Sequence, residues 1–180
     1  MLQTISSALK EKAQNITTFF LDVDGVLTDG SLYFDAQGET LKKFSTLDGH
    51  GLKLLKRAQI VPVVITGRDS PALRKRLADL GIEHAFFGVE NKKSVAEGFL
   101  QSQGQYWNNA AAMGDDWPDL PVLISSQCSF APPGAHEEVI SRVDHVCNLP
   151  AGMGAVRQAC DILLKAKGVY ELVLKEVTLG

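Results

Sequence analysis

Acidic residues follow an apolar run in the segment LDVDGVLTDG, residues 21–30. Asp22 and Asp24 are two positions apart, where the run passes into a loop. Aspartate is a poor strand former, and a buried carboxylate without a partner is energetically costly. A cation, a hydrogen-bonded turn or a reaction could offset that cost. For Asp29 we favour the turn, because Asp side chains often accept hydrogen bonds from the following backbone.

A second acidic segment, GDDWPD at residues 114–119, follows a different apolar run. Its Asp115 and Asp116 are expected at the same edge of the sheet as the first acidic segment. Three or four converging carboxylates cannot all stay ionised without a counter-charge. Hard oxygen ligands in this number favour Mg²⁺, which usually shares its shell with substrate phosphate. The two segments together therefore predict a Mg²⁺ site, in which we expect Asp119 to orient the other groups without touching the metal.

Groups that bind phosphate follow the run VPVVI at residues 61–65. Thr66 supplies a hydroxyl and Gly67 a backbone amide, a small anion-binding arrangement. Arg68 comes next, and its planar guanidinium suits a carboxylate. Lys92 adds a positive charge at the start of a predicted helix, where phosphate is also favoured. These residues predict a site for a substrate that carries both a phosphate and a carboxylate.

The acids and the phosphate-binding groups together predict phosphoryl transfer to a carboxylate. Asp22 is expected to attack phosphorus in line and form an aspartyl-phosphate. Asp24 is placed to protonate the leaving alcohol, and then to take a proton from the water that hydrolyses the intermediate. Thr66 and Lys92 would neutralise the phosphoryl oxygens, where most of the barrier is lowered.

Strand patterns alternate with helix patterns along the chain, which predicts a doubly wound parallel α/β sheet. Ligands bind beyond the carboxyl ends of the strands in such sheets, where these functional residues fall. A β-hairpin insertion is expected after the first strand, at about 31–45. The expected strands are 17–23, 61–65, 84–88, 110–113, 128–131 and an edge strand at 144–148. The expected helices are 5–14, 49–58, 71–80, 91–103, 117–126 (interrupted by Pro121), 136–143 and a last one at 154–168.

Length and composition indicate an ordinary soluble chain, with 180 residues, 45% of them hydrophobic and 22% charged. We expect one domain over 1–180, with a tail at about 169–180. A net charge of −3 and the lack of a basic stripe argue against nucleic acid as a partner. No apolar run is long enough for a membrane span. The three cysteines have no CxxC spacing, which favours reduced thiols and a cytoplasmic location.

DVDGV, Thr66, Lys92 and GDDWPD resemble, in their order, the four motifs of haloacid-dehalogenase-like phosphatases. The likeness covers almost the whole chain, including FSTLDGHG, ITGRDSP and AGMGAVRQACDILLKAKG. These segments are similar to the 3-deoxy-D-manno-octulosonate 8-phosphate phosphatase family, which makes an acidic sugar for lipopolysaccharide. The resemblance implies a Rossmann-like fold without a cap domain, Mg²⁺-dependent hydrolysis of that small phosphorylated sugar acid, and a homotetramer whose hairpins line a central barrel.

The resemblance also implies roles for individual residues. The metal ligands would be Asp22, Asp115 and the backbone carbonyl of Asp24. Two departures from the family pattern are visible: Leu47 stands where relatives often have Arg, and AGMGAVRQ reads GGxGAVRE in many of them. The implied substrate contacts are Asp24, Ser45, Thr46, Leu47, Asp48, Gly49, Gly67, Arg68, Lys92, and Arg76 of a neighbouring subunit.

Several alternatives stay open from the sequence. Within phosphatases, the substrate could be an N-acylneuraminate 9-phosphate, or a macromolecule that covers the site itself. A response-regulator receiver lacks an acid/base Asp two residues after its acceptor, and a non-catalytic binding protein would be expected to lack Asp22 or Asp24. Asp48 is either a helix N-cap or a substrate contact. The tail is either a disordered end or an arm that packs on a neighbour.

Overall fold

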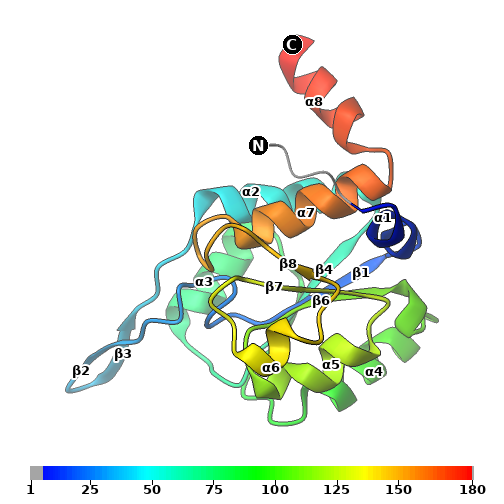
Figure 1. Ribbon diagram of the computed structural model, residues 1–180. Helices are drawn as coiled ribbons and strands as arrows, with labels where there is room; N and C mark the ends of the chain where they lie inside the picture. The colour runs from blue at the N-terminus through cyan, green and yellow to red at the C-terminus, as the bar shows by residue number, and fades with distance from the viewer. Residues whose placement is uncertain (1–5, 180) are drawn as a thin grey trace.

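A six-stranded sheet, parallel at every pairing, forms the centre of the computed structural model, which describes residues 6–179 (Figure 1). The strand order is β5-β4-β1-β6-β7-β8. The predicted doubly wound α/β sheet is therefore confirmed, with the predicted edge strand at one end. The strands are β1 Thr18–Leu21, β4 Val61–Ile65, β5 His84–Phe86, β6 Ala110–Met113, β7 Cys128–Ala131 and β8 His145–Val146.

Helices cover both faces of the sheet. In Figure 1, α1, α2 and α7 lie above it and α4, α5 and α6 below it. Leucines of α3 belong to the same core as α1, α2 and α7. The bounds are α1 Ser7–Ala13, α2 Thr46–Leu55, α3 Pro71–Leu80, α4 Lys92–Ser102, α5 Leu120–Ser125, α6 Glu137–Ile140 and α7 Ala155–Ala166, with 3-10 turns at Lys56–Ala58, Trp107–Asn109 and Trp117–Asp119.

The inner strands β1, β4, β6 and β7 are mostly apolar because both of their faces are buried, apart from Val61 at the start of β4. Phe19 and Leu21 of β1 face the core under α7, and Phe20 faces the core over α4. On that second face the ring centroids of Phe20 and Phe99 lie 6.0 Å apart, edge to face. Two cores thus hold β1 rigidly in the middle of the sheet, which fixes the point where Asp22 leaves it.

Two helix starts differ from the sequence prediction. Helix α2 begins at Thr46 and not near Gly49, because the Ser45 hydroxyl accepts a hydrogen bond from the Asp48 amide (3.4 Å) and so caps the helix. Pro121 does not interrupt a helix but lies in the first turn of α5, where no intrahelical N–H is needed. Ile5, in the predicted first helix, lies outside the described residues.

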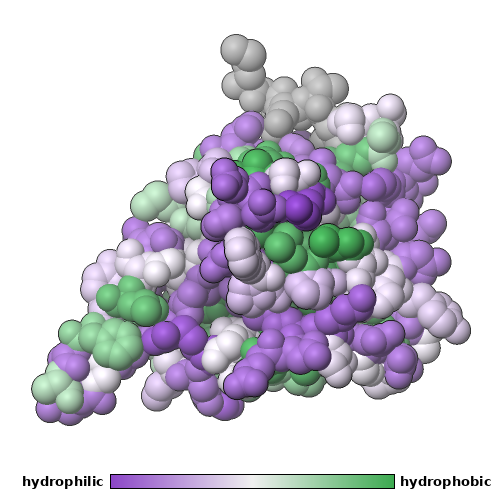
Figure 2. Space-filling model, turned by 60° about the horizontal axis from the view of Figure 1, so that its bottom comes forward, coloured by the Kyte–Doolittle hydropathy of each residue, from purple (hydrophilic) through white to green (hydrophobic). Residues whose placement is uncertain are grey.

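The predicted hairpin is present as β2 Tyr33–Asp35 and β3 Gly38–Leu41, and it projects from the body of the molecule (Figure 1). Apolar side chains are exposed along it (Figure 2), among them Phe34 at 60% and Leu41 at 54%. A small soluble domain seldom exposes a group of large apolar side chains without a partner. The hairpin is therefore a candidate contact surface.

The C-terminal segment forms a further helix, α8 Tyr170–Leu179, so α7 is not the last one. The interpretation of the tail as a disordered end is wrong for these residues, and Gly180 lies outside the described part. Helix α8 extends away from the body, and Val173 is its buried residue (Figure 1). Whether it packs on a neighbour stays a prediction. No helix among residues 6–179 is long and apolar enough to cross a membrane.

Candidate active site

The two acidic segments meet at one edge of the sheet. Leu21 of β1 pairs with Met113 of β6, so Asp22 and Asp115 leave neighbouring parallel strands in the same direction. The Asp22 amide donates to the Met113 carbonyl (3.1 Å), which continues this pairing. Carboxylate oxygens of Asp22, Asp115 and Asp119 all lie within 4.8 Å of one another. The predicted convergence of the two segments is confirmed.

Asp119 organises the second acidic segment. One of its oxygens accepts hydrogen bonds from the backbone amides of Asp115 (3.0 Å) and Asp116 (3.3 Å), and the other lies 2.7 Å from Lys92 Nζ. Gly114 leaves room for this turn, since a Cβ there would lie 2.3 Å from the Asp119 Cβ. These contacts agree with the expected orienting role of Asp119.

Lys92 bridges the two acidic segments from the first turn of α4. Its Nζ lies 2.7 Å from an oxygen of Asp22 and 2.7 Å from one of Asp119, and the residue is only 6% exposed. Burial alone would lower the pKa of Lys92, but the charges of Asp119 and Asp22 raise it. Lys92 therefore stays cationic and neutralises part of the cluster.

One lysine does not neutralise three carboxylates. Burial, together with the charge of Asp119, raises the pKa of Asp22 to about 6. Burial, with the charges of Asp119 and Asp22, raises the pKa of Asp115 to about 7. Oδ1 of Asp115 is buried and has no hydrogen-bond partner among the described residues. This arrangement fits a divalent cation with hard oxygen ligands, as Mg²⁺ requires.

Magnesium is expected to stabilise the fold more at high pH than at low pH. Folded pKa values of about 6 and 7, against an ordinary value of 3.8, mean that the metal-free folded state binds more protons than the unfolded chain. The stability of the metal-free protein therefore falls as pH rises from the ordinary value of 3.8 to the folded values of about 6 and 7. Mg²⁺ must displace those protons, so its stabilisation grows over the same range. At a concentration of about 100 times its Kd, we expect it to add about 2.7 kcal/mol to the free energy of unfolding near pH 8, and much less near pH 5.

Thermal unfolding with and without Mg²⁺ at the two pH values measures this difference. Asp115→Asn should abolish most of the Mg²⁺ effect at the higher pH, whereas Asp35→Asn, on the hairpin, should retain it. An equal Mg²⁺ effect at both pH values would contradict the assignment of the cluster as the metal site.

The predicted phosphate-binding residues lie beside the acidic cluster. Val64 of β4 pairs with Leu21, so Thr66 leaves the same edge of the sheet as Asp22. Thr66 is 1% exposed, and its hydroxyl oxygen accepts the amide proton of Arg68 (3.2 Å). The hydroxyl proton is then free to be donated to an anion. Gly67 lies between these two residues at the start of the loop.

Gly25, in the turn after Asp24, was not assigned a role from the sequence. It has φ +86°, and a Cβ there would lie 2.1 Å from Oδ2 of Asp115. The glycine therefore allows the two acidic segments to approach. The dipeptide Asp24-Gly25 was the available signal, because glycine is required where the backbone turns left-handed beside another chain segment.

Two charged hairpin residues, Glu39 and Lys42, were also missed. Lys42 Nζ lies 2.5 Å from an oxygen of Asp24 and 3.2 Å from one of Glu39. In sequence, Lys42 looks the same as the adjacent Lys43, whose side chain is 47% exposed and pairs with Asp29.

Asp29 also accepts a hydrogen bond from the Ser31 amide (3.1 Å), in agreement with its expected turn role.

The other implied substrate contacts cluster at the start of α2. Arg76 donates to the carbonyl of Ser45 in its own chain (3.0 Å). Asp48 is buried, and its carboxylate accepts the amide protons of Arg157 (2.8 Å) and Gly154 (3.3 Å). It caps α7, so the expectation that it caps its own helix is wrong. Further substrate contacts were implied for Thr46, Leu47, Gly49, Gly67 and Arg68. Of these, Thr46, Leu47 and Gly67 are exposed, the Arg68 side chain is 41% exposed, and Gly49 is buried.

No family model matches the chain, but individual proteins do. The 3-deoxy-D-manno-octulosonate 8-phosphate phosphatase KdsC of Haemophilus influenzae is 42% identical over 160 residues, which are 89% of this chain and 89% of that protein. The corresponding protein of Escherichia coli K12 is 40% identical over 164 residues, 91% of this chain and 87% of the relative.

Solved structures agree with these relatives. A crystal structure of the phosphatase of that name from Moraxella catarrhalis, with a magnesium ion, a phosphate ion and the sugar acid bound, has a TM-score of 0.93 and 31% identity. The match covers 96% of this chain and 99% of the Moraxella catarrhalis chain. A cobalt-bound form from Haemophilus influenzae has a TM-score of 0.85 and 43% identity, with coverage of 88% and 93%.

Proposed function

Since this chain belongs to the 3-deoxy-D-manno-octulosonate 8-phosphate phosphatase family of haloacid-dehalogenase-like hydrolases, we propose that its site hydrolyses that sugar phosphate. The products are the free eight-carbon sugar acid, a lipopolysaccharide precursor, and inorganic phosphate. The observation that carries the proposal is the cluster of Asp22, Lys92, Asp115 and Asp119. Oxygens of its three carboxylates lie within 4.8 Å of one another, and the buried Lys92 lies between Asp22 and Asp119.

Mg²⁺ would be held by Asp22, Asp115 and the backbone carbonyl of Asp24. When bound, it supplies positive charge to the carboxylates and to the substrate phosphate. The unpartnered Oδ1 of Asp115 supports this assignment. The chain itself then provides one fixed cation, Lys92, and the Thr66 hydroxyl for the remaining phosphoryl oxygens.

The reaction proceeds in two displacements at phosphorus. An oxygen of Asp22 attacks in line, the bond from phosphorus to the sugar oxygen breaks, and Asp24 gives that oxygen a proton. A water molecule then attacks the aspartyl-phosphate, its proton passes to Asp24, and the bond between Asp22 and phosphorus breaks. Asp24 ends as it began, and phosphate leaves.

A phosphate-release screen with Mg²⁺ over phosphorylated sugars tests the substrate. We expect the highest kcat/KM for 3-deoxy-D-manno-octulosonate 8-phosphate, well above that for an N-acylneuraminate 9-phosphate. A preference for the nine-carbon sugar would move the assignment to the second acidic sugar. Comparable turnover of many unrelated phosphoesters would defeat both assignments and leave only the reaction class.

The proposal includes a homotetramer whose subunits complete the site. A cavity of about 10 Å³ touches Asp22, Lys92 and Asp119 but is lined mainly by core side chains such as Phe20 and Leu123, and it has room for about one water molecule and none for a sugar. The exposed apolar side chains of the hairpin support an assembly that covers the substrate. Arg76 would then come from a neighbouring subunit. A monomer with full activity in sedimentation experiments at assay concentration would contradict this part.

Residues 1–180 are proposed to act as one catalytic domain in the cytoplasm. The three cysteines, Cys128, Cys147 and Cys160, are buried and unpaired, which supports a reducing compartment. Fractionation that finds the enzyme in the periplasm would contradict the location.

A further inference from the structure

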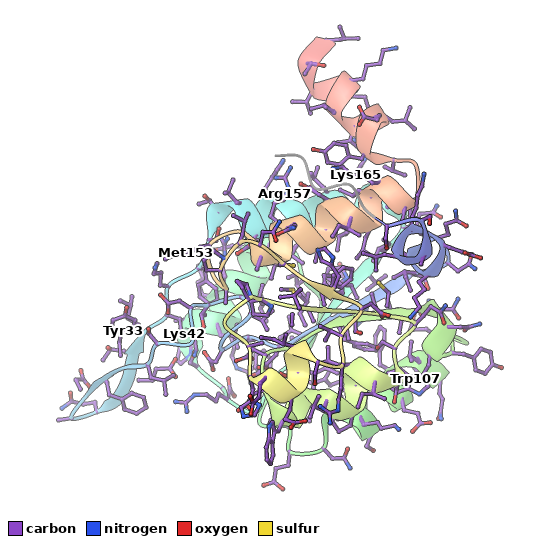
Figure 3. All side chains as sticks on the ribbon, in the orientation of Figure 1. Tyr33, Lys42, Trp107, Met153, Arg157 and Lys165 are labelled. Atoms are coloured by element: carbon purple, nitrogen blue, oxygen red, sulfur yellow. The ribbon has the colours of Figure 1, made fainter. Side chains whose placement is uncertain are left out.

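Lys42 is a buried cation directly after β3, the second strand of a hairpin that is mostly exposed. Its side chain is 1% exposed, against 47% for the neighbouring Lys43. It lies at the base of the hairpin, where the chain re-enters the body after β3 (Figure 3). A buried ammonium group is unfavourable unless it is closely paired. The position of Lys42 therefore depends on the carboxylates around it.

Lys42 belongs to a closed ring of two acids and two bases. Its Nζ lies 2.5 Å from Oδ1 of Asp24 and 3.2 Å from Oε1 of Glu39. Arg68 completes the ring, with Nη2 3.1 Å from Oε2 of Glu39 and Nε 3.7 Å from Oδ2 of Asp24. Each acid thus faces both bases, and the formal charges of the four side chains cancel when Asp24 is a carboxylate.

The two oxygens of Asp24 have different surroundings. Oδ1 is held by Lys42, with the Thr28 hydroxyl 3.4 Å away. Oδ2 is buried and forms no hydrogen bond among the described residues, since Arg68 Nε is too distant for one. A carboxylate that is fixed through one oxygen presents the other in a defined direction.

We propose that Lys42 is a positioning residue, which fixes Asp24 through Oδ1 so that Oδ2 exchanges the proton with the leaving sugar oxygen. The inference rests on the proposed function, in which Asp24 is the acid. As the bond from phosphorus to the sugar oxygen breaks, its electron pair stays on that oxygen and takes the proton from Oδ2. The resulting Asp24 carboxylate remains paired with Lys42. The hairpin is then part of the catalytic unit, because it carries Lys42 and Glu39.

Substrates with different leaving groups distinguish a positioning role of Lys42 from a purely structural one. A sugar alkoxide needs a proton as it departs, whereas p-nitrophenolate is stable enough to leave without one. The ratio kcat/KM covers only the steps up to departure of the leaving group, so later hydrolysis of the intermediate does not mask the effect. A misplaced acid therefore slows the sugar phosphate selectively, and a damaged fold slows both substrates.

The experiment measures kcat/KM for 3-deoxy-D-manno-octulosonate 8-phosphate and for p-nitrophenyl phosphate, with Mg²⁺, in the wild type, Lys42→Met and Lys43→Met. For Lys42→Met we expect a loss of about 10²-fold with the sugar phosphate and less than about 3-fold with p-nitrophenyl phosphate. Lys43→Met, the adjacent control, should change neither by more than about 3-fold. Equal losses with both substrates in Lys42→Met, or no loss with the sugar phosphate, would overturn the inference.

Two further experiments keep the outcome decisive. If Lys42→Met does not fold, Glu39→Gln removes one charged partner of Lys42 and keeps the lysine itself. This variant should also lose more kcat/KM with the sugar phosphate than with p-nitrophenyl phosphate, to a smaller degree; equal losses with both substrates would overturn the proposal. If the wild type turns over another alkyl phosphate and not the octulosonate, the proposed substrate fails. The comparison is then made with that alkyl phosphate, and the role of Lys42 is judged separately.

Discussion

Asp22→Asn is expected to lower kcat by at least about 10⁴-fold, the loss typical of removing a nucleophile. The amide oxygen of Asn is too weak a nucleophile to attack phosphorus, although it has almost the same shape as the carboxylate. The fold should be retained, because removing one buried negative charge relieves the cost of its burial and the repulsion from Asp119, which together raise the pKa of Asp22. Turnover is measured by phosphate release at saturating Mg²⁺, and binding of inorganic phosphate by calorimetry.

Phosphate should still bind to the Asp22→Asn variant, since Thr66, Lys92 and Asp115 are unchanged. Asp29→Asn is the matched control, because Asp29 is an aspartate of the same loop whose contacts are a turn amide and Lys43. Its kcat should stay within about 3-fold of the wild type, as for other surface changes. If Asp22→Asn kept substantial turnover, the covalent route through Asp22 would be wrong.

Lys92→Met is expected to lower kcat/KM by about 10²- to 10³-fold, the usual effect of losing one donor to a developing anion. Lys92 is the buried cation between Asp22 and Asp119, 2.7 Å from each. Without it, the two carboxylates face each other with no counter-charge except a bound metal ion. The metal-free protein should therefore lose about 3–5 kcal/mol of stability, a loss typical when one partner of a buried ion pair is removed.

Lys93→Met provides the control for this variant, because Lys93 is the next residue of α4 and its side chain is exposed. It should match the wild type in kcat/KM and in thermal unfolding. Both quantities are measured with and without Mg²⁺, and the metal should recover part of the stability lost in Lys92→Met. Wild-type kcat/KM in a folded Lys92→Met protein would remove Lys92 from the site.

The convergence of the acidic segments could be predicted because it depends on local signals and one rule of topology. Asp22 and Asp115 each follow a continuous apolar run, and the carboxyl ends of parallel strands meet at one edge of a sheet. The adjacency of β1 and β6 could not be predicted from the runs themselves. The family resemblance implied only that Asp22 and Asp115 share a metal ion, and the register Leu21 to Met113 shows that their strands are neighbours.

Contacts between distant segments were beyond local reasoning. Asp48 was considered as the cap of its own helix, but it caps α7, whose Gly154 lies 106 residues away in sequence. Lys42 and Lys43 are chemically identical neighbours, and only the folded hairpin buries one of them against Asp24. The sequence of helix α8 shows no clear apolar period, because the helix packs on the body through Val173 and leaves most of its other side chains exposed. In each case the deciding partner is set by tertiary packing.

The stereochemical course at phosphorus tests the central claim most directly. Each in-line displacement inverts the configuration at phosphorus, so transfer to Asp22 followed by hydrolysis gives net retention. The measurement uses a thiophosphate analogue of the substrate made chiral at phosphorus with oxygen isotopes and hydrolysed in water of the remaining isotope, with the configuration of the released inorganic thiophosphate read by phosphorus NMR. Retention is the predicted result, and inversion would show direct attack by water and contradict the aspartyl-phosphate.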